Sequence, residues 1–346
     1  MHRLLALLPV LASLLVGCAT APAADAGAAP PVLKRIAGEA MGTTWSVQAV
    51  VPAGVDTATL RAAVEAVLDG IDRDMSAWRS DSALSRFNRA PAGSRVHLPP
   101  DLVAVLDYGL ALAEDTGGAY DPSVGALVEA WGFSTGTRRQ APPDAASLAA
   151  ARARVGWRRL RLDAAGGTLV QPGGVTLDVN AIAPGHAVDR VAARLAALGA
   201  SAWLVELGGE FAAHGRKPDG QPWRIAVELP PGAQADDLAA AIVELDDRAA
   251  GSSGDYRDYF EYAGVRYAHT LDPRSGAPVV HALAAVTVLD ATAMRADAQA
   301  AALMVLGPDQ GWAWAQARGL AAVFVIRRDA GFDVRMTPAF ERALAR

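Results

Sequence analysis

The sequence predicts an α+β protein with mixed or antiparallel sheets. Three observations support this fold class. Long stretches carry apolar residues at helical spacing, shorter apolar stretches lie between them, and many of the shorter stretches are separated by Gly-rich turns rather than by crossover helices. Hydrophobic residues make up 52% of the 346 residues and charged residues 20%, so the composition is that of a globular chain. This length predicts two lobes or one elaborated domain.

The first half of the chain begins with a predicted strand and two predicted helices. The strand covers 41–51, and the first helix covers 57–75, where apolar residues repeat every three to four positions. The second helix covers 101–115 and is expected to be capped by Asp101. Pro184 opens a later helix, because proline is tolerated in a first turn. Between these helices we expect strands over 158–162, 168–171 and 174–179.

The second half alternates predicted strands with predicted helices. One pair of strands, 259–262 and 265–271, forms a hairpin across Ala263-Gly264. The other expected strands cover 202–207, 223–228, 242–246, 284–289 and 321–326. The other expected helices cover 297–306, 310–318 and 338–344.

The N-terminal segment resembles the signal of a bacterial lipoprotein. A short basic start precedes the apolar stretch 4–17, which is too short for a bilayer span of about 20 residues. The stretch ends in Leu15-Val16-Gly17-Cys18, which is similar to a lipobox, and Cys18 is the only cysteine. We therefore expect a signal peptide over 1–17, a lipid on Cys18, an Ala/Pro tether over 18–33 and the functional domain over 34–346. The alternative is an ordinary signal peptide with an incidental cysteine.

Charge and the N-terminal segment together predict where the protein works. The net charge is −5, so the chain lacks the overall positive charge that nucleic-acid binding needs. Two or more acyl chains would anchor the protein durably in a membrane. We expect the anchored protein on the periplasmic side, with the inner membrane preferred. The outer membrane stays open, because Ala19 is not the aspartate associated with inner-membrane retention.

Polar, Gly-rich segments interrupt the predicted elements where plain connections would suffice. Each is a weak signal alone. Taken together and in order, over about 34–320, they resemble the ApbE family, flavin transferases that move FMN from FAD onto a threonine or serine of a protein. The segments are MGTTW from Met41 and the stretches 75–88, 117–133, 177–190, 205–210, 251–257, 269–279 and 294–307.

The resemblance implies a two-lobed fold related to the T-fold, with a FAD cleft between the lobes and a magnesium ion. It also implies a partner: an acceptor protein with a threonine- or serine-containing flavinylation motif, typically a subunit of an electron-transfer or Na⁺-pumping complex. FAD is then a substrate, and Mg²⁺ is the cofactor of the transfer.

The resemblance also implies a role for individual residues. Met41 matches a methionine that lies against the flavin, and Trp78 stands where the family usually has a tyrosine. Asp297 and the backbone carbonyl of Ala183 match the magnesium ligands. His269 matches a family histidine, with Leu271 as an apolar contact beside it. The remaining matches to the cofactor site are Ala119, Tyr120 and Asp121, which line the cofactor, and Asn180 and His186, which bracket the loop around the diphosphate.

Phosphotransfer depends mainly on positioning and on neutralising charge, and several residues are candidates for these tasks. His269 is a candidate base for the acceptor hydroxyl, or else a hydrogen-bond partner of a phosphate. Asp255 and Asp272 are rival candidates for the base. A turn over 251–254 could present successive backbone N–H groups to a phosphate. Glu206 and Glu210, on either side of Gly208-Gly209, are either cleft carboxylates or solvated strand ends.

Several of these residues also have a purely structural interpretation, and two depart from the family pattern. Asp297 could be a helix N-cap, and Trp78 and Tyr120 could be ordinary core or rim aromatics. Pro184 stands where family members usually carry a lysine, and Ala301 where they usually offer a metal-binding threonine. These departures favour an alternative, a flavin-binding lipoprotein without activity. A third possibility is a magnesium-dependent FAD pyrophosphatase that uses water as the nucleophile.

Overall fold

The computed structural model describes residues 30–134, 139–228, 230–231 and 242–344. The predicted signal peptide, the lipidation site Cys18 and most of the predicted tether lie outside the described residues. Strand β1 (Val32–Ala40) begins slightly before the predicted start of the domain at residue 34.

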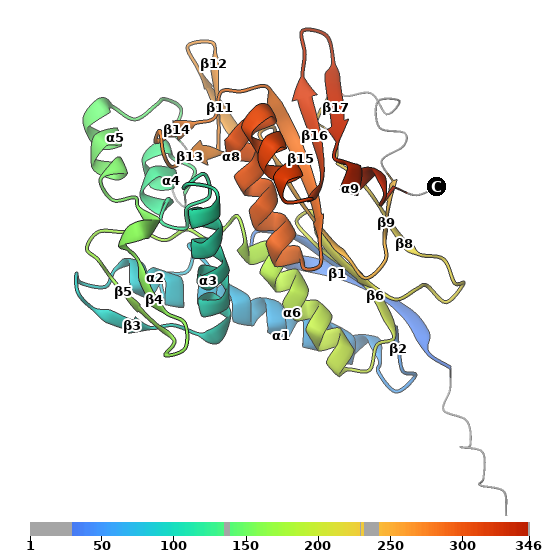
Figure 1. Ribbon diagram of the computed structural model, residues 1–346. Coiled ribbons are helices and arrows are strands. Elements are labelled where there is room, and N and C mark those ends of the chain that lie inside the picture. The colour runs from blue at the N-terminus through green and yellow to red at the C-terminus, as the bar shows by residue number, and fades with distance from the viewer. Residues whose placement is uncertain (1–29, 135–138, 229, 232–241, 345–346) are drawn as a thin grey trace, which may run out of the picture.

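A single antiparallel sheet of eight strands forms the centre of the molecule (Figure 1). Its order is β1-β2-β6-β7-β10-β15-β16-β17, and every neighbouring pair is antiparallel. Antiparallel neighbours need only short connections, which explains why hairpins join many of the strands. After β1 the strands cover Thr43–Val51 (β2), Ala202–Leu207 (β6), Glu210–His214 (β7), Ala249–Gly254 (β10), Leu283–Asp290 (β15), Ala321–Arg327 (β16) and Phe332–Met336 (β17).

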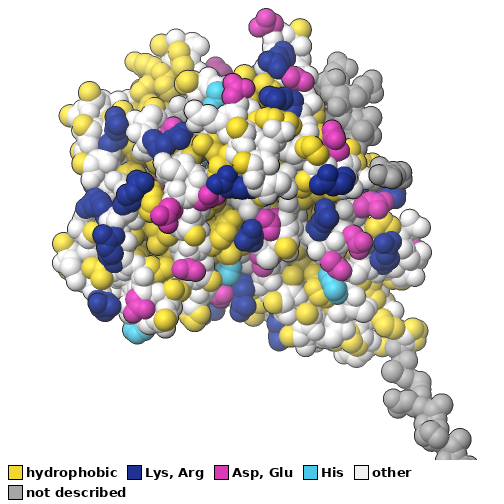
Figure 2. Space-filling view, viewed as in Figure 1, with side chains coloured by type: hydrophobic (Ala, Val, Ile, Leu, Met, Phe, Trp, Pro, Cys, Tyr) yellow, Lys and Arg dark blue, Asp and Glu magenta, His cyan; other side chains and the backbone are white. Residues whose placement is uncertain are grey.

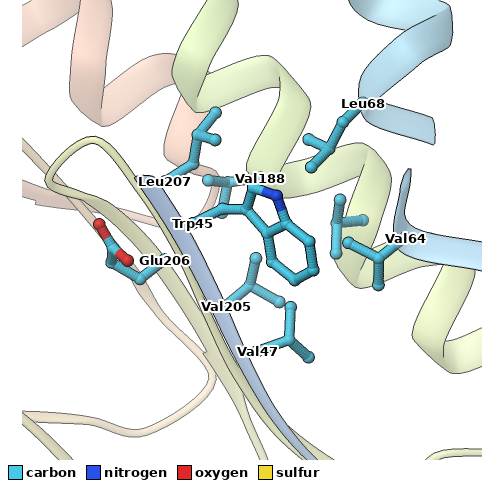
Figure 3. A pocket seen from close by; sticks show the side chains of 9 residues that line it. Trp45, Val47, Val64, Leu68, Val188, Val205, Glu206 and Leu207 are labelled. Carbon is cyan, nitrogen blue, oxygen red and sulfur yellow. The ribbon is translucent and has the colours of Figure 1, made fainter. Parts of the chain in front are cut away.

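Three helices cover one face of this sheet: α1 (Thr57–Met75), α6 (Ala183–Ala197) and α8 (Ala293–Ala317) (Figure 1). Their apolar side chains pack against Trp45 and its neighbours on β2 and β6 (Figure 3). The void that remains there has a volume of about 10 Å³, about that of one water-sized sphere, so the layer is closely packed. α8 is interrupted at Gly307, where φ is +77°, followed by Pro308.

The opposite face of the sheet carries a smaller layer. Strands β8 (Trp223–Ala226) and β9 (Ile242–Leu245) pair there, and α9 (Pro338–Glu341) packs beside them. The buried side chains of Trp223 and Phe340 fill the space between this layer and the sheet. Both faces of the central sheet are therefore covered.

A second group of elements lies beside the helical layer (Figure 1). It contains a three-stranded sheet in the order β3-β5-β4, a group of short helices, and two hairpins contributed by later parts of the chain. The helices are α2 (Ala83–Asn88), α3 (Pro100–Asp115), α4 (Gly125–Trp131), α5 (Ala145–Arg152) and the 3₁₀ turn η1 (Trp157–Arg159). The strands are β3 (Arg95–His97), β4 (Arg161–Asp163), β5 (Thr168–Val170), β11 (Tyr259–Tyr262), β12 (Val265–Ala268), β13 (Leu271–Asp272) and β14 (Ala277–Pro278).

The predicted α+β class with antiparallel sheets is confirmed, and several local predictions are wrong. Asp101 does not cap α3, because the helix begins earlier, after Pro99. The stretch 174–179 contributes a single bridge, from Thr176 to Val124, rather than a strand. The predicted turn over 251–254 is part of strand β10. The two helices expected over 297–306 and 310–318 are confirmed as the two segments of α8, which the non-helical Gly307 separates. The two-lobed arrangement with a cleft stays a prediction.

No helix in the described part of the chain combines the length and the apolar character needed to cross a membrane.

Candidate active site

The site forms where the first turn of α6 meets the first turns of α8. The backbone N–H of Gly185 donates to Oδ2 of Asp297 over 3.0 Å. A Cβ atom on Gly185 would lie 2.4 Å from the carbonyl oxygen of Ala293, so only glycine permits this approach. Ala183 lies in the same turn as Gly185 and is buried. The structure thus brings the two predicted metal-binding positions, Ala183 and Asp297, to one helix junction.

Asp297 is a buried carboxylate and not a helix cap. Thr292 is the N-cap of α8, and its hydroxyl accepts from the N–H of Arg295. Asp189 accepts hydrogen bonds from the N–H groups of Ala293 and Met294, at 2.8 and 2.9 Å. The backbone N–H groups at the start of α8 therefore have partners other than Asp297. Asp297 is only 6% exposed, and burial, helped by the negative charge of Asp189, raises its pKa to about 7.

A second carboxylate, Glu210, lies at the same place. It is the first residue of β7 and is 7% exposed. Burial and the nearby charge of Asp297 raise the pKa of Glu210 well above its usual value, although Arg257 opposes this shift. We call Asp297, Glu210 and Asp189 the acidic centre. Of the two open interpretations of Glu210, a solvated strand end is wrong.

Glu206 belongs to the other face of the sheet. It pairs with Phe211 in the ladder between β6 and β7, so its side chain points away from that of Glu210. Its carboxylate accepts from the Ser46 hydroxyl over 3.1 Å and from the N–H of Gly209 over 3.3 Å. Glu206 lines a cavity of about 410 Å³ together with Phe211, Ser252 and Arg257. This cavity lies over the sheet and not at the helix junction.

The predicted cofactor segment 119–121 borders the acidic centre. All three of its side chains are buried, and burial together with the charges of Asp297, Asp178 and Asp121 raises the pKa of Tyr120 well above its usual value. Asp121 accepts from the N–H and the hydroxyl of Ser123, at 2.8 and 2.6 Å, and from the N–H of Trp157 at 3.2 Å. Asp121 therefore fixes the loop, and burial raises its pKa in spite of these bonds.

The residues around the helix junction fit a divalent cation. The buried carboxylates of Asp297 and Glu210 repel each other, a costly arrangement that a bound positive charge would relieve. No trio of His, Cys, Asp or Glu side chains within the described ranges forms a complete metal site. Magnesium does not need one, because it accepts carbonyl oxygens, water and substrate phosphates as ligands.

His269 is oriented by its own backbone neighbourhood. Its Nδ1 lies 3.1 Å from the carbonyl oxygen of Asp258, which only accepts hydrogen bonds. Nδ1 must therefore carry the hydrogen, which leaves Nε2 as the nitrogen able to accept a proton. Both rival bases are engaged elsewhere. Asp255 forms a two-pronged ion pair with Arg327, and Asp272 forms one with Arg274 at 2.9 Å for each bond.

The other predicted residues lie in different environments. Trp78 is 72% exposed in the loop after α1. His186 is buried and its Nε2 lies 3.0 Å from Asp101, so it joins α6 to α3. Asn180 is exposed, and its backbone N–H donates to Asp178 over 2.9 Å. Leu271 is buried in the cluster around α4 and α5.

Met41 lies in a strained turn between β1 and β2. It and Gly42 form the two-residue connection between β1 and β2, with φ values of +51° and +76°. Positive φ at both positions fits a type I′ turn, and methionine adopts it only at an energetic cost. The N–H of Gly208 donates to the carbonyl of Thr44 over 3.1 Å, which joins this turn to the turn that precedes Glu210.

The residues 251–254, predicted to form a phosphate-binding turn, form part of a strand instead. These residues pair with 285–288 of β15 as part of the central sheet. A Cβ atom on Gly251 would lie 2.4 Å from the backbone nitrogen of Asp297, so this glycine lets the strand pass directly beneath α8. Because Gly251 has no side chain, the backbone of Asp297 can lie directly against the central sheet.

The sequence did not identify Asp189 and Asp178 as part of the site. Asp189 lies one turn after Gly185 on α6, and Asp178 lies just before the predicted loop. Both fall within the polar segment 177–190, and this segment is the feature of the sequence that points to them. Neither residue could be singled out without knowing that α8 begins opposite α6.

An antiparallel α+β fold with a buried acidic centre at two helix N-termini defines a protein that can hold a charged ligand at a helix junction. Comparison with known proteins gives its family. The chain belongs to the ApbE family, whose model matches residues 41–324. The predicted resemblance is thereby confirmed.

Named relatives cover almost the whole chain. The FAD:protein FMN transferase of Klebsiella pneumoniae (strain 342) is 36% identical over 96% of this chain and 94% of its own length. The protein of the same name from Haemophilus influenzae is 37% identical over 89% of this chain and 90% of its own length.

Solved structures show the same fold. The apo flavinyl transferase ApbE of Pseudomonas stutzeri matches with a TM-score of 0.83 and 44% identity, over 90% of this chain and 97% of that one. The flavin transferase ApbE of Vibrio cholerae matches with a TM-score of 0.82 and 34% identity, over 91% of this chain and 100% of that one.

Proposed function

We propose that this chain transfers FMN from FAD to a threonine or serine hydroxyl of an acceptor protein. The relatives named FAD:protein FMN transferase align along nearly all of its length, so protein flavinylation is the function that they support. The observation that carries the proposal within the molecule is the helix junction, where Gly185 and Asp297 meet beside Glu210.

The proposed reaction exchanges one phosphorus–oxygen bond for another. The acceptor hydroxyl oxygen forms a bond to the phosphorus of the FMN half, the bond to the bridging oxygen of the diphosphate breaks, and AMP leaves. The hydroxyl proton passes to a base. His269 suits this role, because its hydrogen-bonded Nδ1 leaves Nε2 unprotonated.

We propose magnesium as the cofactor of this site. Asp297 and the carbonyl of Ala183 would hold it, with Glu210 as a further negative charge in the acidic centre. When bound, the ion would offset the negative charge that phosphates carry into the site. The side chain of Ala301 offers no oxygen one turn after Asp297, and Pro184 supplies no cation beside it, so water and nearby arginines would have to replace both groups.

We also propose the cellular setting that the sequence predicts. A lipid on Cys18 would tether the protein to a membrane, facing the periplasm, with the inner membrane preferred. The acceptor would then be a subunit of an electron-transfer or Na⁺-pumping complex in the same compartment.

One incubation tests the function. Protein lacking residues 1–29 is mixed with FAD, Mg²⁺ and a threonine-containing acceptor domain, and covalent flavin fluorescence on the acceptor is followed in a denaturing gel. Labelling with AMP release supports the transferase, and the Asp297→Asn variant is the matched control. AMP release without labelling would indicate a pyrophosphatase, and bound flavin with neither product would indicate a carrier.

A further inference from the structure

Five arginines gather on one exposed stretch of the second group of elements. Residues 151–161 read ARARVGWRRLR, with no acidic residue among them. They cover the end of α5, η1 and the start of β4. Figure 2 shows Lys and Arg side chains along the side of the molecule where Figure 1 places these elements. We call the following set the arginine strip: Arg152, Arg154, Arg158, Arg159 and Arg161.

The strip lacks the ion pairs that hold many other surface arginines. Arg154 and Arg159 each donate over 2.8 Å to backbone carbonyls, those of Gly174 and Gly173. Arg158 lies 4.3 Å above the ring of Trp157. Among the described residues, no member of the strip forms an ion pair with a carboxylate. By contrast, several exposed arginines elsewhere do so, among them Arg224 with Glu244, Arg328 with Asp333 and Arg73 with Asp69.

These contacts fix the guanidinium groups without neutralising them. A carbonyl oxygen accepts a hydrogen bond but carries no net charge, so these contacts do not neutralise the guanidinium groups. The buried carboxylate of Asp121 attracts Arg158, without an ion-pair contact between them. The chain as a whole has a net charge of −5, whereas this stretch is locally positive. Oriented charges of one sign form a surface suited to a partner of the opposite sign.

The strip begins at the rim of the proposed site. The N–H of Trp157, in the middle of the strip, donates to Asp121. A Cβ atom on Gly118 would lie 3.3 Å from the indole nitrogen of Trp157, so this ring covers the start of the predicted cofactor segment. Arg152 reaches the carbonyl of Arg274 over 3.4 Å, in the turn between β13 and β14.

We propose that the arginine strip is the docking surface for a carboxylate-rich face of the acceptor protein. The inference rests on the proposed function. A hydroxyl that belongs to a protein reaches the site only if that protein covers the surface beside it, and the strip borders the site. Carboxylates on the acceptor would pair with guanidinium groups that are already held in place, which lowers the ordering cost of the encounter.

The test uses a charge change on both partners. The strip variant R152Q/R158Q/R161Q alters three exposed members and leaves the carbonyl contacts of Arg154 and Arg159 intact. The control variant R73Q/R224Q/R328Q removes three exposed arginines that are ion-paired. The probe is a threonine-containing acceptor domain with carboxylates flanking the threonine, and the same domain with those carboxylates changed to amides.

We expect the strip variant to raise the KM for the acidic domain about tenfold at 50 mM NaCl, with the KM for FAD unchanged. The acceptor Kd of the unsubstituted protein, measured by titration, should weaken about tenfold between 50 and 300 mM NaCl, and that of the strip variant much less. The control variant should behave like the unsubstituted protein, and the amide domain should not distinguish the variants.

Other outcomes overturn the proposal. Equal acceptor Kd values and salt dependences for the strip variant and the unsubstituted protein would exclude docking through the strip. Loss of binding to phosphatidylglycerol vesicles in the strip variant, with an unchanged acceptor Kd, would assign the strip to a lipid surface instead. Absence of covalent labelling by the unsubstituted protein, with salt-dependent acceptor binding, would refute the proposed function and leave the docking inference standing.

Discussion

The acidic centre and the arginine strip are charged regions built in opposite ways. The carboxylates of Asp297 and Glu210 are buried side by side, and burial raises the pKa of each. The members of the strip lie at the surface and are held by carbonyl oxygens or a ring face. The first arrangement costs folding free energy that a bound cation would recover, whereas the second costs little. Buried like charges therefore mark a ligand site, and exposed like charges mark a contact surface.

The strongest test of this contrast is Asp297→Asn. The amide keeps the shape of the carboxylate and its ability to accept from Gly185, but it removes the charge. We expect flavin transfer to fall by about 10³-fold, while the metal-free protein unfolds at the same temperature or a higher one. Activity assays and thermal unfolding in EDTA check the two halves. Retained activity would remove Asp297 from the site.

A smaller effect is expected from Gly185→Ala, which changes no charge. The new Cβ would meet the backbone of Ala293 at 2.4 Å and push α6 away from α8. We expect a loss of about 2–4 kcal/mol in the free energy of unfolding. Gly70→Ala is the control, because a Cβ there has no neighbour within 4 Å. Equal stability of the two variants would show that the junction is looser than the structure indicates.

The next effect is expected in the pH dependence of stability, which the buried acidic centre should produce and the exposed arginine strip should not. The pKa of Asp297 is about 7 in the folded state against 3.8 for the free side chain, and that of Glu210 is also raised. The folded state then binds more protons than the unfolded state between these values, so stability falls as pH rises from about 4 through about 7. Urea unfolding in EDTA at pH 5 and pH 8 measures this fall. The Asp297→Asn variant should show a smaller one, and equal falls would contradict the buried charge.

Ala301→Thr tests whether an added oxygen beside Asp297 strengthens magnesium binding at the acidic centre. Ala301 lies one turn after Asp297 on the same face of α8 and packs against the core in a partly buried position. A threonine hydroxyl there would add an oxygen beside Asp297. We expect magnesium to bind a few-fold more tightly, as measured by the Mg²⁺ dependence of transfer. Weaker binding together with lower activity would mean that the site is fitted around the alanine.

The smallest effect is expected from Arg161→Gln in the strip. Within the described part of the chain, Arg161 donates only to nearby carbonyls, those of Arg158 and Leu160. The free energy of unfolding should change by less than about 0.5 kcal/mol. Denaturant unfolding at pH 7 provides the measurement. A loss above 1.5 kcal/mol would give the strip a role in folding and weaken the contrast drawn here.

Much of the fold could be predicted because periodicity is a local signal. The helix over 57–75 and the hairpin that turns at Ala263-Gly264 were confirmed with their boundaries nearly unchanged. Strand β10 was missed because Gly251, Ser252, Ser253 and Gly254 have the composition of a turn. Its strand conformation is imposed by β15 and by the close passage of α8.

The site was predictable only in part, because local patterns do not encode the contacts between distant parts of the chain that form it. The polar segments and the resemblance that they carry identified Ala183 and Asp297, which the structure brings to one junction. Glu210 could not be assigned, because its burial depends on which face of β7 meets α8. Asp101 was expected to cap its own helix, yet it lies beside His186 and Arg190 of α6, and no local pattern encodes such a distant pairing.

The break at Gly307 divides α8 into two segments that make different contacts. The first segment carries Asp297, while the second packs Trp312 against Phe324 and brings the indole nitrogen of Trp314 within 3.4 Å of the carbonyl of Asp115. Since the backbone leaves helical geometry between them, a twist or shift of the second segment is absorbed before it reaches the first. Lengthening the chain by one residue after Pro308 would therefore rotate the distal tryptophans and spare the carboxylate of Asp297.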